Sequence, residues 1–257
     1  MTIDGTALRP VILRFDSLPS TNTEAARQAR LGAKEGLCVV AREQTDGRGR
    51  EGRVWISPAG AGLYLSMVLR PLRLAMRQWP LLTLMAALAV HDALAEECAL
   101  ETDIKWPNDI VVEERKLGGI LAEAIETQVG PAVILGIGIN LEDRSFPAEL
   151  SGVATSVLAA TGHASEGERL MRSLISAIGK RYKALQAVGG FEETVREWSK
   201  HSTYALDRRV RVSLRAETFD GWTRGLEPDG ALRVETDQGE MRIVRAGDVT
   251  SLRSAVE

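Results

Sequence analysis

Three arginines and three glycines fall within the seven residues from Gly47 to Arg53, which read GRGREGR. Glycine lets the backbone adopt positive φ and approach a ligand closely, whereas arginine carries a permanent planar charge that matches phosphate or carboxylate. The segment therefore predicts a mobile anion-binding loop. Activation of a carboxylic acid by ATP needs such charge, because a carboxylate and the α-phosphate must meet despite their repulsion. The candidate cations are Arg48, Arg50, Arg53 and Lys116.

The same glycines also spell G-x-G-x-x-G, the fingerprint of dinucleotide-binding sites. That fingerprint requires a helix that begins at the last glycine, whereas this chain continues with a proline-broken, turn-rich stretch over residues 54–60. We therefore reject a dinucleotide site. The chain has no Walker A sequence, so any phosphate contact would come from the loop itself. A solvated basic surface loop is the alternative.

Two further segments carry residues suited to a ligand site, KWPND (Lys105 to Asp109) and KLGGIL (Lys116 to Leu121). Pro107-Asn108-Asp109 is a good turn sequence, and Lys116 falls in a predicted hairpin turn, where a lysine is usually solvated. The segment GIGIN, residues 136–140, lacks side-chain bulk on one face. That pattern indicates either close packing or a ligand that lies on the sheet.

Hydrophobic periodicity predicts an α+β domain over residues 1–203. Strands are expected at 11–15, 37–41, 63–69, 110–112, 117–125 and 132–139, and helices at 25–31, 80–97, 166–185 and 191–199. Thr21 and Glu24 have the spacing of a capping box at the start of the first helix. Residues 113–116 are expected to form a tight hairpin turn between two strands.

The last fifty residues change character and predict a small all-β barrel or sandwich over residues 204–257. Val210, Val212 and Leu214 alternate with polar residues, as in a half-buried strand. Turn signals recur at Asp220-Gly221, Asp229-Gly230 and Gln238-Gly239. The boundary near Tyr204 is expected to be a short connection.

Composition predicts a soluble, cytoplasmic protein with no nucleic-acid or membrane partner. The net charge of −3 over 257 residues gives no overall attraction to nucleic acid or anionic lipid. The first twenty residues lack the apolar core of a signal peptide, and the strongest apolar run, residues 81–90, is too short to span a bilayer. Cys38 and Cys98 show no metal or redox spacing, and the three histidines are scattered, so neither a zinc site nor a histidine triad is expected.

The motifs occur in the order and approximate spacing of biotin protein ligases, and the chain resembles that family along essentially its whole length. The matching segments are Ser20-Thr21-Asn22, Gln44, GRGREGRVW, KWPND, KLGGIL, GIGIN and the terminal Thr250-Ser251-Leu252-Arg253. The combination of the arginine loop with KWPND is highly specific. The resemblance implies a class II synthetase-like mixed sheet with flanking helices, and a small C-terminal SH3-like β-barrel.

The resemblance also implies roles for individual residues. The implied biotin-binding set is Ser20, Thr21, Asn22, Gln44, Gly47, Arg48, Gly49, Arg50, Lys116, Gly118 and Gly138. The implied nucleotide-binding set is Arg50, Arg53, Trp55, Lys105, Asn108, Lys116 and Asn140. The implied catalytic set is Arg48, Arg50, Lys116 and Asp109. Asp109 would lie near the reacting centre and orient or deprotonate an incoming lysine. No metal ligands follow from the motifs.

By this resemblance, the chain would join biotin and MgATP to give biotinyl-5′-AMP, then transfer biotin to a lysine of a biotin carboxyl carrier protein, such as that of acetyl-CoA carboxylase. Family members often form homodimers. Only about sixteen residues precede the SLPSTN region, which leaves no room for the helix-turn-helix domain of the repressor type, and Glu51 replaces a residue that is frequently basic or small. The alternatives are a lipoate ligase or acyltransferase of the same superfamily, and a biotin-sensing regulator or binding module.

Overall fold

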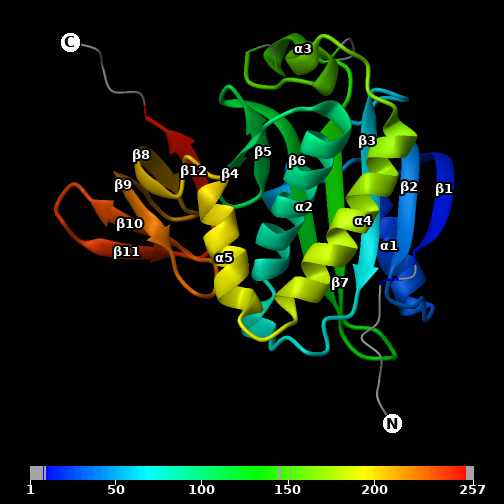
Figure 1. Cartoon of the computed structure of the whole chain (residues 1–257), viewed down its shortest axis with the longest axis horizontal. Helices are drawn as coiled ribbons and strands as arrows, with labels where there is room; N and C mark the ends of the chain where they lie inside the picture. Colours follow the sequence, from blue (N-terminus) through cyan, green and yellow to red (C-terminus); the bar gives the residue numbers. More distant parts are fainter. Residues whose placement is uncertain (1–7, 9, 144–145, 151, 253–257) are drawn as a thin grey trace.

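The computed structural model describes residues 8, 10–143, 146–150 and 152–252 (Figure 1). Arg253, which belongs to the terminal motif named above, lies outside the described residues. These described residues form one large mixed sheet, five α-helices and a separate small sheet that carries the C-terminal strands.

The large sheet has seven strands in the order β1-β2-β3-β7-β6-β5-β4. Its strands are β1 (Val11–Leu18), β2 (Leu37–Gln44), β3 (Gly62–Leu69), β4 (Asp103–Lys105), β5 (Asp109–Val112), β6 (Arg115–Ile125) and β7 (Ala132–Asn140). β1 and β2 pair in parallel because helix α1 (Thr21–Arg30) connects them, and every other neighbouring pair is antiparallel. The predicted α+β class with a mixed sheet is confirmed.

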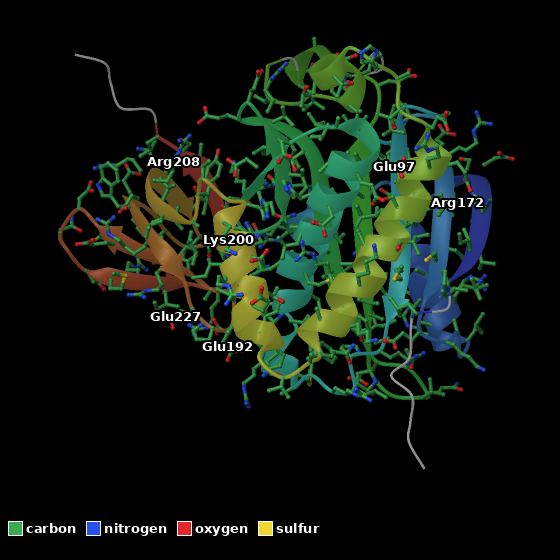
Figure 2. All side chains as sticks on the ribbon, viewed as in Figure 1. Glu97, Arg172, Glu192, Lys200, Arg208 and Glu227 are labelled. Carbon is green, nitrogen blue, oxygen red and sulfur yellow. The ribbon has the colours of Figure 1, made fainter. Side chains whose placement is uncertain are left out.

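Different helices cover the two faces of this sheet. α2 (Leu81–Cys98) and α4 (Gly167–Leu185) cover one face, and α5 (Gly190–Lys200) packs beside α2 (Figure 1). Alternate residues of β3 show the division, since Leu65 and Met67 join the core under α2, whereas Val68 joins a smaller core under α1. The exposed residues Arg172 and Lys200 mark the outer sides of α4 and α5 (Figure 2).

α2 is apolar around its circumference because it lies between the sheet and the other helices. From Leu84 to His91 every residue is buried, and Glu96 near the C-terminal end is the one exposed residue of the helix. A helix of this kind gains its stability from packing on all sides. The short helix α3 (Val157–Thr161) follows β7 and was not predicted.

The C-terminal sheet has five antiparallel strands in the order β11-β10-β9-β8-β12. They are β8 (Leu206–Ser213), β9 (Thr218–Leu226), β10 (Leu232–Thr236), β11 (Met241–Val244) and β12 (Asp248–Ser251). Within the described residues the edge strands β11 and β12 do not pair with each other, so the closed barrel is not observed.

Most predicted elements lie where the sequence pattern placed them, with three local corrections. The predicted turn at Asp220-Gly221 lies inside β9, whereas the turns at Asp229-Gly230 and Gln238-Gly239 are confirmed. The hairpin turn after β5 consists of Glu113 and Glu114, both with positive φ, so Lys116 belongs to β6 and not to the turn. The predicted capping box is absent, as described below.

Candidate functional site

A row of glycines forms the floor of a cavity on the α1 face of the sheet. Gly119 of β6 pairs with Gly138 of β7, and Gly136 lies two residues away along the same strand. A Cβ atom at Gly136 would approach Asn22 Oδ1 to 2.1 Å, and one at Gly138 would approach Trp55 Nε1 to 2.5 Å. Only glycine fits these two positions, because the side chains above them rest on the backbone. Close packing, one of the two expectations for the GIGIN segment, is observed, and Gly136 and Gly138 also line the cavity.

One end of the cavity is polar and carries no net charge, because its two charged side chains, Arg48 and Glu123, pair with each other, and it is built around the first turn of α1. Gln44 Oε1 accepts hydrogen bonds from the Thr21 backbone N–H at 2.8 Å and from the Thr21 hydroxyl at 3.1 Å. Gln44 therefore satisfies a free N–H at the start of the helix, which is the task the sequence assigned to a capping box. That assignment was wrong, because Ser20 is the extended N-cap residue and makes no side-chain cap bond.

Asn22 is fixed in one orientation by its neighbours. Its Oδ1 accepts from the hydroxyl of Ser66 at 2.6 Å, and its Nδ2 donates to Glu123 Oε2 at 2.8 Å and to the backbone oxygen of Leu121 at 3.3 Å. Asn22 and Ser66 are both buried. Sequence reasoning missed Ser66 and Glu123, although a serine within an otherwise apolar strand is a usable signal for Ser66.

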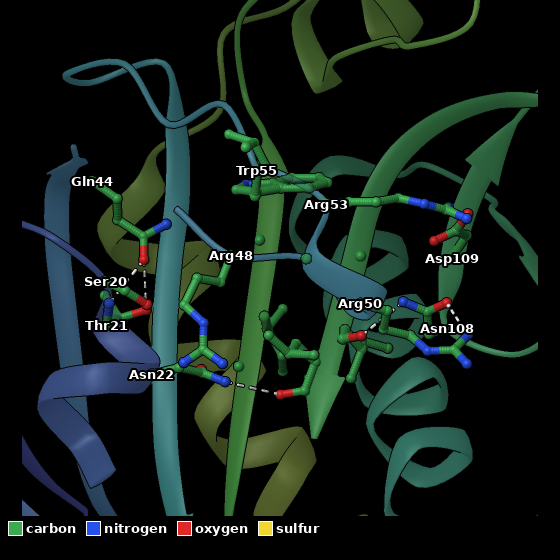
Figure 3. Close-up of a pocket in the computed structure, with 18 of the residues that line it drawn as sticks. Ser20, Thr21, Asn22, Gln44, Arg48, Arg50, Arg53, Trp55, Asn108 and Asp109 are labelled. Atoms are coloured by element: carbon green, nitrogen blue, oxygen red, sulfur yellow. Dashed lines mark hydrogen bonds between the residues drawn. The ribbon is translucent and has the colours of Figure 1, made fainter. Parts of the chain in front are cut away.

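The arginine loop sends its three side chains to different places (Figure 3). Arg48 points toward Asn22 and forms an ion pair with Glu123, whereas Arg50 and Arg53 extend toward Asn108 and Asp109. Arg48, Arg50 and Lys116, which were predicted to act together, all line this cavity, but Arg48 pairs with Glu123 whereas Lys116 pairs with Asp109.

The other end of the cavity is cationic, and each cation has an oxygen partner. Lys116 Nζ lies 2.5 Å from Asp109 Oδ1 and 5.5 Å from the centre of the Trp55 ring. Arg50 donates to Asn108 Oδ1 at 3.2 Å and to the backbone oxygen of Gly247 at 3.4 Å. Burial lowers the pKa of Arg50, which stays charged because an arginine titrates far above neutral pH.

The C-terminal sheet contributes to the cationic end through the start of β12. Asp248 forms an ion pair with Arg53, and Gly247 supplies the backbone oxygen that Arg50 contacts. Both residues were missed, because nothing in the sequence relates the start of β12 to a loop almost two hundred positions earlier.

Trp55 covers the centre of the cavity. Its ring lies against Gly138 and Gly119, and its indole N–H is buried without a hydrogen-bond partner in the described part of the chain. The cavity that remains holds about 100 Å³, whereas sites for small molecules commonly hold about 300–1,000 Å³. The side chains of the arginine loop therefore fill part of the space that a ligand would occupy.

Four of the predicted residues do not line this cavity. Lys105 lies opposite Asp109 in the β4–β5 pair and 5.8 Å from the ring of Tyr204, and burial lowers its pKa. Asn140 donates to the backbone oxygen of Thr155 at 3.0 Å. Gly118 faces the opposite side of the sheet, and Gly47 packs against the backbone of Trp55.

The remaining predicted residues come together around the cavity. They are Ser20, Thr21, Asn22, Gln44, Arg48, Gly49, Arg50, Arg53, Trp55, Asn108, Asp109, Lys116 and Gly138. Within residues 8, 10–143, 146–150 and 152–252, no three histidines, cysteines or carboxylates are grouped so that they could hold a metal ion. Among the helices in the described part of the chain, none has the length and apolarity needed to cross a bilayer.

Comparison with known proteins identifies both parts of the chain. Residues 14–140 match the biotin/lipoate A/B protein ligase family, and residues 205–250 match the C-terminal domain of biotin protein ligases. The bifunctional ligase/repressor BirA of Bacillus subtilis is 37% identical over 239 residues, which cover 91% of this chain and 72% of that protein. The biotin–[acetyl-CoA-carboxylase] ligase of Mycobacterium tuberculosis is 34% identical over 239 residues, which cover 91% of this chain and 86% of that protein.

A solved structure shares the fold as well as part of the sequence. The biotin protein ligase from Aquifex aeolicus, in complex with biotin and ATP, superimposes with a TM-score of 0.81 at 28% identity. The superposition covers 95% of this chain and 99% of that one. The matched families, the two relatives and this structure agree, and the chain belongs to the biotin protein ligase family.

Proposed function

We propose that this chain joins biotin to ATP to form biotinyl-5′-AMP and then transfers biotin to a lysine of a biotin carboxyl carrier protein. The observation that carries the proposal is the division of the cavity into a hydrogen-bonding end without net charge and a cationic end, with a glycine floor between them. Biotin has the same division, because a neutral ureido group and a carboxylate stand at its opposite ends.

The end without net charge offers the groups that a ureido ring requires. Both hydrogens of Asn22 Nδ2 are already bonded within the protein, and Ser66 uses one lone pair of Oδ1. A ligand can therefore form a hydrogen bond to Asn22 only by donating to the second lone pair of Oδ1. An acceptor there suits a ureido N–H. The Ser20 hydroxyl lines the cavity and makes no hydrogen bond to the described residues, so it is available to donate to the ureido carbonyl. Thr21 and Gln44 hold this arrangement in place.

The cationic end suits the first chemical step. An oxygen of the biotin carboxylate attacks the α-phosphorus of ATP, the bond to the bridging oxygen breaks, and pyrophosphate leaves. Lys116, Arg50 and Arg53 surround the position where negative charge accumulates, and preorganised cations stabilise such a transition state. ATP would enter with Mg²⁺, which binds phosphate oxygens.

The residues implied to bind the nucleotide fall into two groups according to whether they line the cavity. Trp55 and Asn108 line the cavity, and the broad indole face of Trp55 suits an adenine ring. Lys105 and Asn140 lie outside the lining and are assigned supporting roles. Lys105 places a second positive charge opposite Asp109. Gly47, Gly49 and Gly118 let backbone segments approach one another around the ligand.

The second step requires a neutral amine from the acceptor lysine. The amine nitrogen attacks the carbonyl carbon of the mixed anhydride, AMP leaves with the electron pair of the broken C–O bond, and an amide forms. We assign Asp109 to receive the amine proton, because its carboxylate reaches the cavity beside Lys116. Lys116 must first break its ion pair with Asp109 and bind the phosphate instead. The carboxylate of Asp109 is then free to accept the proton.

The alternatives are a lipoate ligase and a biotin-sensing regulator. Lipoate carries a dithiolane ring with no strong hydrogen-bonding groups, so it would leave the polar end of the cavity unpaired, and such sites discriminate strongly against the analogue that lacks the polar group. To separate the alternatives, the purified chain is incubated with ATP, magnesium and either biotin or lipoate, and the adenylate is identified by mass spectrometry. Biotinyl-AMP followed by biotin on a carrier domain is expected. Lipoyl-AMP alone, or tight biotin binding without any adenylate, would contradict the proposal.

We also propose the wider organisation of the protein. Residues 1–203 form the catalytic domain with a class II synthetase-like sheet, and residues 204–257 form a C-terminal domain related to SH3-like barrels. The two thiols, Cys38 and Cys98, are unpaired, which suits the cytoplasm. Sequence-specific DNA binding is not expected, and an edge strand of the large sheet would join two chains into a homodimer. Gel-shift assays and sedimentation test the last two statements.

A further inference from the structure

We propose that Glu123 is a positioning residue, whose single carboxylate both holds the Arg48 end of the arginine loop against the cavity and sets the orientation of Asn22. The inference rests on the proposed function, because it concerns the pocket assigned to the ureido group. None of the short sequence motifs includes Glu123.

The carboxylate of Glu123 joins two elements that are far apart in sequence. Oε2 accepts from Asn22 Nδ2 at 2.8 Å, in the first turn of α1, and Oε1 pairs with the guanidinium of Arg48 in the loop. Each oxygen therefore has its own partner. Glu123 lies on β6, whose backbone also accepts from Asn22 through Leu121, so the strand holds Asn22 at two points.

The ion pair between Glu123 and Arg48 can restrain the whole arginine loop, because Arg48 is joined to the other side of the loop. Its backbone forms an isolated antiparallel bridge with Val54, and the N–H of Gly49 donates to the oxygen of Arg53 at 2.7 Å. The two limbs of the loop are thus already joined to each other. Holding the side chain of Arg48 on β6 restrains both limbs above the floor of the cavity.

The contact with Asn22 distinguishes this arrangement from an ordinary surface ion pair. A partly exposed arginine–carboxylate pair contributes little by itself, and the side chains of Arg48 and Glu123 are 44% and 28% exposed. Asn22, however, is only 4% exposed, and its Oδ1 is committed to Ser66. Without the carboxylate, a buried N–H of Asn22 loses its acceptor, and the amide can turn over and present the wrong group to the ureido ring.

Glutamine is the informative replacement because it keeps the shape of the side chain but has one oxygen. Glu123→Gln can accept from Arg48 or from Asn22, and it must turn its NH₂ group toward the other donor. Glu126→Gln is the matched control. Glu126 is exposed just after the end of the same strand, its carboxylate has no partner in the described part of the chain, and the substitution removes the same charge.

The experiment uses the full chain and three measurements. Limited trypsin digestion without ligand, read by mass spectrometry, follows cleavage after Arg48, Arg50 and Arg53, and stopped-flow fluorescence follows release of biotinyl-AMP. Glu123→Gln is expected to speed both about tenfold, because a charge-assisted contact is lost, while adenylate formation at saturating biotin changes less than threefold. Glu126→Gln should match the parent in all three. In the digestion, cleavage after Arg50 and Arg53 should be no faster in the double variant Glu123→Gln/Arg48→Gln than in Arg48→Gln alone, since both changes break the same contact with the loop.

Two results would overturn the inference. Unchanged digestion and release in Glu123→Gln would mean that the carboxylate holds nothing. Slower release of biotinyl-AMP would mean that Glu123 competes with the ligand for Arg48 and does not position it. The digestion needs no ligand, so it tests Glu123 even if the parent chain makes no adenylate, a result that would refute the proposed function separately.

Discussion

The indole of Trp55 rests directly on the backbone of Gly138, at a distance that excludes any side chain at position 138. A Cβ atom there would lie 2.5 Å from Nε1 and 2.6 Å from Cε2 of the ring. Because real Cβ contacts are longer, the smallest possible substitution must displace the ring or the strand. Trp55 and Gly138 are therefore matched in shape, although 83 positions separate them.

Gly138→Ala should lower the rate of adenylate formation by about a hundredfold or more, because displacement of reacting groups by about 1 Å can cost that much. The melting temperature should change little, since the added methyl group enters the cavity and not the core. Gly179→Ala in α4 is the control, because a Cβ there meets only Leu8 at 3.9 Å. Near-normal adenylation in Gly138→Ala would show that the ring does not need this position.

Lys116→Ala should lose most adenylation activity, by about a hundredfold, if Lys116 stabilises charge between the carboxylate and the phosphate. Lys116→Arg should not restore it fully, because a planar fork cannot replace a compact ammonium in contact with Asp109. The side chain is 34% exposed, so the melting temperature should hardly change. Pyrophosphate release and thermal unfolding are measured on the same variant. A large fall in melting temperature would mean that the lysine is structural.

Arg50→Ala should slow adenylate synthesis by about a hundredfold through lost transition-state stabilisation, and should make any adenylate formed leak faster. The variant also loses the contact with Gly247 that joins the loop to the C-terminal sheet. Pyrophosphate release and retention of the adenylate on a gel-filtration column are the two measurements. Normal synthesis together with tight retention would remove Arg50 from the mechanism.

Ser66→Ala should raise the Michaelis constant for biotin about fivefold while kcat is retained, because one buried hydrogen bond of ordinary strength is lost. The reason is that Ser66 donates to Asn22 Oδ1 and so holds the amide that we assign to the ureido ring. Steady-state kinetics with varied biotin checks the prediction. An unchanged constant would show that Asn22 keeps its orientation without Ser66.

His91→Gln should weaken the pH dependence of stability. Burial, reinforced by neighbouring His201, lowers the pKa of His91 in the folded protein, although Glu101 and Asp92 oppose the shift. The unfolded chain takes up a proton near pH 6.5 that the folded chain resists, so the free energy of unfolding falls as the pH drops below about 6.5 toward the lowered pKa. Urea unfolding from pH 7.5 to 5.5 should show a smaller fall in the variant. Equal falls would contradict the assignment.

Sequence reasoning located most of the large sheet because its strands are apolar runs between clear turns. It missed β4, which has only three residues, and α3, which has five, since such short elements show no period. It placed Asp220-Gly221 in a turn, although Gly221 is buried within β9, where a Cβ would lie 2.4 Å from the backbone oxygen of Glu235. A glycine required by close packing looks the same in the sequence as a glycine required by a turn.

The sequence predicted which residues line the cavity better than it predicted how those residues are arranged. The motifs named most of the residues that line it, but they did not show that the side chains of Arg48 and Arg50 go to opposite ends (Figure 3). Glu123 and Asp248 were missed, because each is an isolated carboxylate whose role depends on a partner brought close only by folding.

The pairing of cations with resident acceptors has a consequence for how ionic conditions affect the protein. A ligand carboxylate or phosphate arriving at this site takes the place of oxygens already bound, so binding is an ion exchange within the protein and not the neutralisation of an open positive surface. The affinity for the ligand then depends on the difference between the contacts that the cations make with the ligand and those that they make with the protein. The affinity should therefore change little when salt is added. The acceptors that give way are Asp109 for Lys116, Asp248 for Arg53, and Asn108 with Gly247 for Arg50.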